Sequence, residues 1–103
     1  MDLSEIQKDI IQNKLNKGFN TTDVFKEFCF LYGEVGEALE AYRKKKDNLG
    51  EELADVAIYL LGLSEILGID LEKEIYNKMI KNQNRKYEKI NGVNIKIRGV
   101  IVI

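Results

Sequence analysis

Two acidic stretches, EVGE at residues 34–37 and ELAD at residues 52–55, are separated by a polar joint at residues 43–48. Each stretch holds two carboxylates three residues apart, and residues at this spacing lie on one face of a helix, about 5–6 Å apart at Cβ. Because the two segments are otherwise largely apolar and their joint is short, the sequence predicts two helices that fold back as an antiparallel hairpin. All four carboxylates are then expected to face a common point.

The positions of the four acids along this hairpin support a shared site. At about 1.5 Å rise per residue, Glu37 and Asp55 lie at the same level, roughly 10 Å from the turn. Glu34 lies about 4–5 Å beyond that level and Glu52 about 4–5 Å short of it. Four carboxylates brought together would repel one another and raise each other's pKa values. A hard divalent cation with oxygen ligands is the simplest compensation, and Mg²⁺ fits best, with Mn²⁺ as the alternative.

Each acid taken alone has an ordinary structural explanation. Glu52 lies in the first turn of its helix, where acidic residues complement the positive end of the helix dipole. Asp55 is harder to explain in this way, because aspartate is a poor helix former and is costly to bury without a partner. The prediction of a metal site therefore rests on the two pairs together and on the hairpin that joins them.

Composition and length exclude several classes of function. The 103 residues correspond to a single domain, and the net charge of −1 gives no reason to expect binding to a nucleic-acid polymer or a membrane. The start of the sequence has no signal-peptide pattern and there is one cysteine, so we expect a cytoplasmic protein without an internal disulfide. The absence of histidine excludes Ser-His and Cys-His catalysis and the histidine-bearing metal sites.

The pattern of apolar residues and helix caps predicts an all-α antiparallel bundle of about four helices in one domain, residues 1–103. Ser4 and Gln7 form an expected capping box for the first helix, and Thr21 or Thr22 is expected to cap the second. The first helix is expected to stop at Gly18, and the third to begin at Asn48 and to end at Gly68. The fourth is expected to run to about residue 86. Residues 92–103 are rich in β-branched side chains and read as a short extended tail.

Apolar residues recur along the second helix at spacings of three and four, the pattern of a packed seam. The seam consists of Phe25, Phe28, Tyr32, Val35, Leu39 and Tyr42. Cys29, which stands within this segment, is expected to be a core residue. Phe19 precedes the helix and is read first as a hydrophobic staple, with a wall for a flat base as the alternative.

The fourth helix carries cations where an apolar stripe is usual. The positions i, i+3, i+4 and i+7 share one helix face, and they hold Lys78, Lys81, Asn82 and Arg85. A solvated face is the ordinary interpretation of this pattern. Beside a metal cluster, the same stripe suits the phosphates of a ligand, because lysine supplies a point charge and arginine a bidentate fork.

Several motifs in order resemble the MazG-like nucleotide pyrophosphohydrolases. They are KGF (17–19), EVGE (34–37), EELAD (51–55), LGIDL (67–71) and the Lys81-Asn82 … Arg85 group, so the resemblance covers about residues 17–87. Two positions depart from the family's usual pattern, since Gly33 replaces a frequent glutamate and Ala54 a frequent glycine. Neither change removes an expected ligand.

The resemblance implies an all-α bundle completed by dimerisation, as a homodimer or homotetramer. It implies Mg²⁺-dependent cleavage of a nucleoside triphosphate substrate to the monophosphate and pyrophosphate, in the house-cleaning of the nucleotide pool. By position, the metal ligands are Glu34, Glu37, Glu52 and Asp55. Lys81, Asn82 and Arg85 then lie near the phosphates, with Lys78 beside them.

Two other functions compete with this interpretation. Phosphoribosyl-ATP pyrophosphohydrolases break the same class of bond with a related acid-rich bundle. Alternatively, the chain is a non-catalytic helical dimerisation module with solvated acids. For a catalytic chain without histidine, the base is either metal-activated water or a glutamate, and the sequence leaves that choice open.

Overall fold

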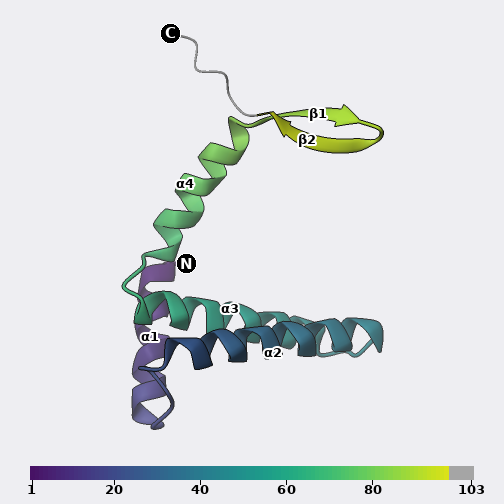
Figure 1. Ribbon diagram of the computed structural model, residues 1–103. Helices are drawn as coiled ribbons and strands as arrows, with labels where there is room; N and C mark the ends of the chain where they lie inside the picture. The colour runs from purple at the N-terminus through teal and green to yellow at the C-terminus, as the bar shows by residue number, and fades with distance from the viewer. Residues whose placement is uncertain (98–103) are drawn as a thin grey trace. The chain divides into compact units, whose positions relative to one another are not determined.

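The computed structural model describes residues 1–97 as four helices followed by a two-stranded hairpin (Figure 1). The elements are α1 (Leu3–Asn16), α2 (Val24–Arg43), α3 (Leu49–Ile66), α4 (Leu71–Gln83), β1 (Lys86–Ile90) and β2 (Val93–Ile97). The chain divides into two compact units, Met1–Glu72 and Lys73–Ile103. The predicted all-α class with a short extended tail is confirmed, whereas dimerisation and the single-domain organisation stay predictions.

The first unit is built on the antiparallel pair of α2 and α3, which lie side by side, with α1 crossing the end of the pair (Figure 1). The close approach of α1 to α3 depends on Gly62 of α3. A Cβ atom at this position would lie 3.1 Å from Cγ2 of Ile10 and 3.5 Å from Cε of Lys14. The missing side chain therefore leaves room for the crossing helix.

The ends of α1 and α3 share one geometry. After α1, the Phe19 N–H donates to the Lys14 carbonyl at 2.9 Å while Gly18 takes a left-handed φ of 69°. Gly68 has the same role after α3, with φ of 70°. This is the helix-ending motif that glycine favours, because it has no Cβ to clash. The predicted stops at Gly18 and Gly68 are therefore confirmed.

The starts of α1 and α2 differ from the prediction. Asp2, not Ser4, is the N-cap of α1. Asp23, not Thr21 or Thr22, is the N-cap of α2, and it accepts from the Lys26 N–H at 3.1 Å. The physical reason is that a carboxylate both accepts the free N–H groups and complements the helix dipole, an advantage that a hydroxyl lacks.

Gln7, expected to complete a capping box, is instead a buried connector of the first unit. Its amide donates to Glu65 at 3.0 Å and to the Ile69 carbonyl at 2.8 Å, and its oxygen accepts from the Leu71 N–H at 3.0 Å. Three hydrogen bonds from one amide thereby join α1 to the segment that connects α3 with α4.

The expected seam of α2 is left uncovered by the described residues, 1–97. Its apolar side chains are all exposed, with Tyr32 at 77% and Leu39 at 57% of their full accessibility. The buried positions of α2 are instead Glu27, Ala38 and Ala41. α3 covers only one side of α2, so packing of the seam stays a prediction that depends on a partner surface. Cys29, expected in the core, is exposed as well.

The second unit contains most of α4 and an antiparallel hairpin. α4 ends at Gln83, earlier than predicted, and β1 pairs with β2 so that Ile90 faces Val93. The two linking residues, Asn91 and Gly92, have φ of 52° and 79°, the left-handed pair that a tight two-residue hairpin turn requires. The expected strand is thus confirmed for β2, while its partner β1 was missed. The remainder of the predicted tail, residues 98–103, lies outside the described residues.

In the described part of the chain, none of the helices has the length and apolar character needed to cross a bilayer.

Candidate metal centre

Three of the four predicted carboxylates meet between α2 and α3. One carboxylate oxygen each from Glu34, Glu37 and Glu52 lie within 4.8 Å of one another. Glu34 and Glu37 are one helical turn apart on α2, and Glu52 comes from the first turn of the antiparallel α3. The hairpin therefore brings carboxylates from both helices to one place, which is the arrangement that a small cation with oxygen ligands needs.

Asp55, the fourth predicted acid, lies close to this group but is not among the three oxygens that converge. It stands three residues after Glu52 on α3, and its charge is one of those that raise the pKa of Glu34. Its side chain is exposed. The structure thus places Asp55 at the rim of the acidic cluster.

Two oxygens of the cluster lack partners. Oε2 of Glu34 and Oε2 of Glu52 are buried and, within residues 1–97, accept no hydrogen bond. The other oxygen of Glu52 accepts from Nδ2 of Asn48 at 3.1 Å. Buried carboxylate oxygens without partners are costly, and a divalent cation satisfies both at once. The residues present therefore fit an oxygen-coordinated metal ion.

The electrostatics of the cluster agree with its geometry. Burial raises the pKa of Glu34 above its ordinary value of 4.5, and the charge of Glu37 raises it further. The pKa of Tyr59, which follows Asp55 by one turn of α3, is also raised, first by burial and then by the charges of Glu34 and Glu27. Crowded negative charge of this kind is relieved when a cation binds.

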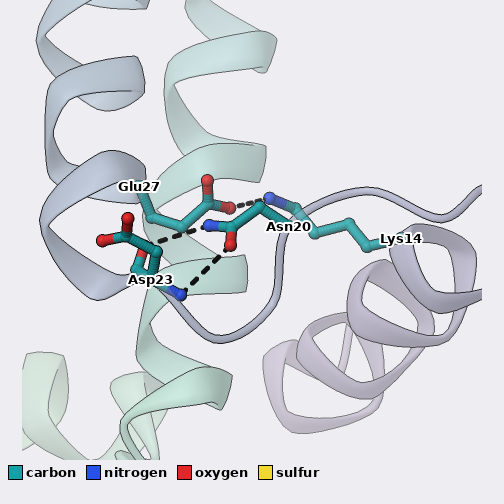
Figure 2. Close-up of polar contacts among 4 residues, drawn as sticks. All are labelled: Lys14, Asn20, Asp23 and Glu27. Atoms are coloured by element: carbon teal, nitrogen blue, oxygen red, sulfur yellow. Dashed lines mark hydrogen bonds and ion pairs between the residues drawn. The ribbon is translucent and has the colours of Figure 1, made fainter.

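A second polar group was missed in the sequence. Lys14 of α1 and Glu27 of α2 form a buried ion pair, with exposures of 8% and 2% (Figure 2). Beside it, Asn20 holds the start of α2, since its amide donates to the Asp23 carbonyl at 3.0 Å and its oxygen accepts from the Asp23 N–H at 3.1 Å (Figure 2). The pair therefore joins α1 to α2 where the connecting loop is also fixed.

The sequence contained a signal for this pair. Lys14 follows Ile6 and Ile10 at intervals of four residues, so a charged residue continues the apolar stripe of α1. Glu27 stands seven residues before Glu34, which is two turns along the same row of α2. Opposite charges on the inward faces of successive helices indicate a buried pair.

A cavity of about 260 Å³ opens beside the ion pair. It is lined by Lys14, Phe19, Asn20, Lys26, Glu27, Phe30 and Tyr59. The rings of Phe30 and Tyr59 meet edge to face with centroids 6.1 Å apart. Phe19 lies four residues before the N-cap of α2, too far for the staple that was the first interpretation. It lines the cavity instead, and its role as a wall for a flat base stays a prediction.

The predicted phosphate-binding residues belong to the second unit. Lys78, Lys81 and Asn82 are exposed on α4, and Arg85 is half-buried just beyond its end. The single helix places the first three on one face, as the spacing predicted. Their role beside phosphates stays a prediction.

The match of residues 21–98 to the family model described as the MazG-like family covers most of the chain. The chain belongs to the MazG-like family. This agrees with the resemblance carried by the acidic motifs, and the carboxylate cluster lies inside the matched segment.

Solved and curated proteins support the family assignment. The MazG-like pyrophosphohydrolase of cyanophage S-2L, solved with dGDP and three catalytic Mn²⁺ ions per active site, is 29% identical to this MazG-like chain. The likeness has a TM-score of 0.68 and covers 95% of this chain and 99% of the phage protein. The dCTP pyrophosphatases 1 of Mus musculus and Rattus norvegicus are each 36% identical over 53% of this chain. The aligned part is 41% of each rodent protein, so the chain spans less than half the length of these curated relatives.

Proposed function

We propose that this MazG-like chain hydrolyses nucleoside triphosphates to the monophosphate and pyrophosphate with the help of Mg²⁺, and that Mn²⁺ can replace it. The observation that carries the proposal is the pair of buried oxygens, on Glu34 and Glu52, that lack partners among residues 1–97. Membership of the family and the nucleotide and Mn²⁺ in the phage structure support it. The expected role in house-cleaning of the nucleotide pool is part of this proposal.

Glu34, Glu37 and Glu52 would hold the cation, with Asp55 at the rim as the fourth ligand. A divalent cation there would supply Lewis-acid chemistry that neutralises charge on the phosphate oxygens. The three carboxylates that converge come from two helices of one hairpin. The carboxylates are therefore held in place before substrate arrives, which lowers the cost of organising the site.

The base that takes the proton of the attacking water is a glutamate or metal-activated water, the two that the sequence left open. The chain has no histidine, so a carboxylate is the base that it can itself supply near neutral pH. Burial raises the pKa of Glu34 in the metal-free chain, but a cation bound to this carboxylate would lower that pKa again, so the shift does not choose between the two bases.

Polar residues of α4 and Arg85 just beyond its end orient the phosphates. Lys78, Lys81 and Asn82 supply donors from one face of the helix. Arginine binds phosphate oxygens through two parallel N–H groups, and lysine adds positive charge.

We also propose that the protein is a homodimer, or a homotetramer built from dimers. The support is the exposed apolar face of α2, on which Tyr32, Leu39 and Tyr42 are between 57% and 77% exposed. A contiguous apolar face of this kind marks an interaction surface. A second copy of the same helix is the simplest cover, since a two-fold axis pairs a surface with itself. A cytoplasmic location also stays a prediction.

The test is pyrophosphate release from a panel of ribo- and deoxyribonucleoside triphosphates with Mg²⁺, with phosphoribosyl-ATP in the same panel. Glu37→Gln and Asp55→Asn are expected to abolish release while circular dichroism shows an intact helical fold. Glu40→Gln is the matched control, because Glu40 lies on the same helix and pairs with Arg43 and Lys44 at the surface. Undiminished pyrophosphate release by Glu37→Gln refutes the proposal. If phosphoribosyl-ATP alone is turned over, the substrate is phosphoribosyl-ATP rather than a nucleoside triphosphate.

A further inference from the structure

Glu27 presents a buried carboxylate oxygen that its ion pair leaves unused. Its side chain is 2% exposed, and one oxygen contacts Nζ of Lys14. Its Oε2 accepts no hydrogen bond from any of residues 1–97, and Figure 2 shows the second oxygen turned away from Lys14. A buried acceptor without a donor is costly. A ligand that brings an N–H group to this oxygen removes that cost.

The cavity beside Glu27 suits a flat, aromatic ligand. Phe19, Phe30 and Tyr59 contribute three rings to a space of about 260 Å³. Nζ of Lys14 lies 4.9 Å from the centroid of the Tyr59 ring and borders the same space. A planar heterocycle among these rings gains stacking and edge contacts. In the lining of the cavity it meets an acceptor residue, Glu27, and a donor residue, Lys14, which contact each other.

This cavity lies about one helical turn from the acidic cluster. Phe30 precedes Glu34 by four residues on α2, and Tyr59 follows Asp55 by four residues on α3, which corresponds to about 6 Å along each helix. Tyr59 lines the cavity together with Glu27, and the charge of Glu34 also acts on it, so this ring lies near both the cluster and the ion pair. A nucleotide with its phosphates at the cluster thus has its base within reach of the cavity.

Given the proposed function, on which this inference rests, we infer that Glu27 selects substrates whose nucleobase carries an exocyclic amino group. An ionised carboxylate only accepts hydrogen bonds, so an amino group satisfies its free oxygen. A carbonyl oxygen in the same place meets the carboxylate without a proton between them and leaves both unsatisfied. The ammonium group of Lys14, next to Glu27, donates to a ring nitrogen or a carbonyl oxygen on the same edge of the base.

Binding of uncleavable substrates tests the inference without turnover. The probes are α,β-methylene deoxynucleoside triphosphates with Mg²⁺, measured by calorimetry in matched pairs: cytosine against uracil, adenine against hypoxanthine, and guanine against hypoxanthine. The base bound most tightly is expected to carry an amino group, and its partner without that group to bind about 10- to 100-fold more weakly, as expected for a buried acceptor left unpaired. Equal affinities within every pair would overturn the inference.

Two variants separate base recognition from a purely structural ion pair. Glu27→Gln is expected to bind both members of the best pair within about threefold of each other, because its amide can turn a donor toward a carbonyl. The double variant Lys14→Met/Glu27→Gln leaves no buried ammonium unpaired and is expected to lose the discrimination as well. Glu40→Gln, the control on the same helix, keeps it. Full discrimination in the double variant would show that Glu27 only holds Lys14.

The outcomes also separate this inference from the proposed function. If none of the analogues binds the unaltered protein, the hydrolase proposal fails and the inference fails with it. If all analogues bind with Mg²⁺ but without preference for amino groups, the hydrolase proposal stands and only the role of Glu27 is refuted.

Discussion

Lys14 of α1 and Glu27 of α2 form an ion pair between the two helices, and both side chains are almost excluded from solvent. Removing one member leaves the other as an uncompensated buried charge, which costs about 3–5 kcal/mol. We therefore expect Lys14→Met to lower the free energy of unfolding by about this amount, measured by urea denaturation. Lys14→Met/Glu27→Gln should recover most of the loss, and a loss below about 1 kcal/mol in the single variant would contradict a buried pair.

The stability of the metal-free protein should depend on pH through Glu34. Its pKa in the folded protein lies above the ordinary value of 4.5, first because of burial and then because of Glu37 and Asp55. The folded state therefore holds this proton more tightly than the unfolded state, and stability decreases as pH rises from 4.5 through the raised pKa. We expect Glu34→Gln to raise the melting temperature at pH 7 and to change it less near pH 4.5. The same gain at both values would contradict this.

Divalent cations should stabilise the folded chain. A ligand that binds only the folded state adds about 2.7 kcal/mol at a concentration 100 times its Kd. Mg²⁺ or Mn²⁺ is expected to raise the melting temperature, and the increase should largely disappear in Glu52→Gln, which loses one of the acidic cluster's two unpartnered buried oxygens. Glu40→Gln should keep the full increase. If neither cation changes the melting temperature, the result favours the alternative function, a non-catalytic helical dimerisation module.

The exposed face of α2 should control the oligomeric state. Tyr32→Glu and Leu39→Glu place charges on an apolar surface that a second copy is proposed to cover. We expect light scattering to show a dimer or tetramer for the unaltered protein and a shift to monomer in either variant, since an unpaired charge in an interface is costly. Lys45→Glu, in the loop between α2 and α3, is the control. A monomeric unaltered protein at micromolar concentration would refute the proposed dimer.

The cations of α4 should affect substrate turnover more than folding. Arg85→Ala and Lys81→Ala each remove a charge-assisted hydrogen bond to phosphate, worth about 1.5–3 kcal/mol. We expect kcat/KM for the best triphosphate to fall about 10- to 100-fold, with little change in melting temperature for the exposed Lys81. Lys73→Ala, on the same helix but outside the stripe, is the control. Equal losses in all three variants would point to a general effect of charge.

The features that could be predicted from the sequence are those set by residues close together in the chain. Helix stops at Gly18 and Gly68 follow from the left-handed φ that glycine adopts freely. The meeting of Glu34, Glu37 and Glu52 follows from their helical spacing and the short joint between α2 and α3. The Asn91-Gly92 pair is an equally local signal, because a tight two-residue hairpin turn favours Asn-Gly. The strand β1 that precedes this turn was therefore predictable in principle.

Tertiary structure decided the features that depend on which surfaces meet. The sequence pattern of α2 indicated an apolar seam, but periodicity does not say whether its partner lies in the same chain, and the seam is exposed here. The crossing of α1 brought Lys14 to Glu27 and formed a cavity with Tyr59 of α3. The sequence by itself thus determined the helices and the acidic cluster, because both arise from local spacing. Only the packing of three helices decided which charges became buried, because burial depends on contacts between residues far apart in the chain.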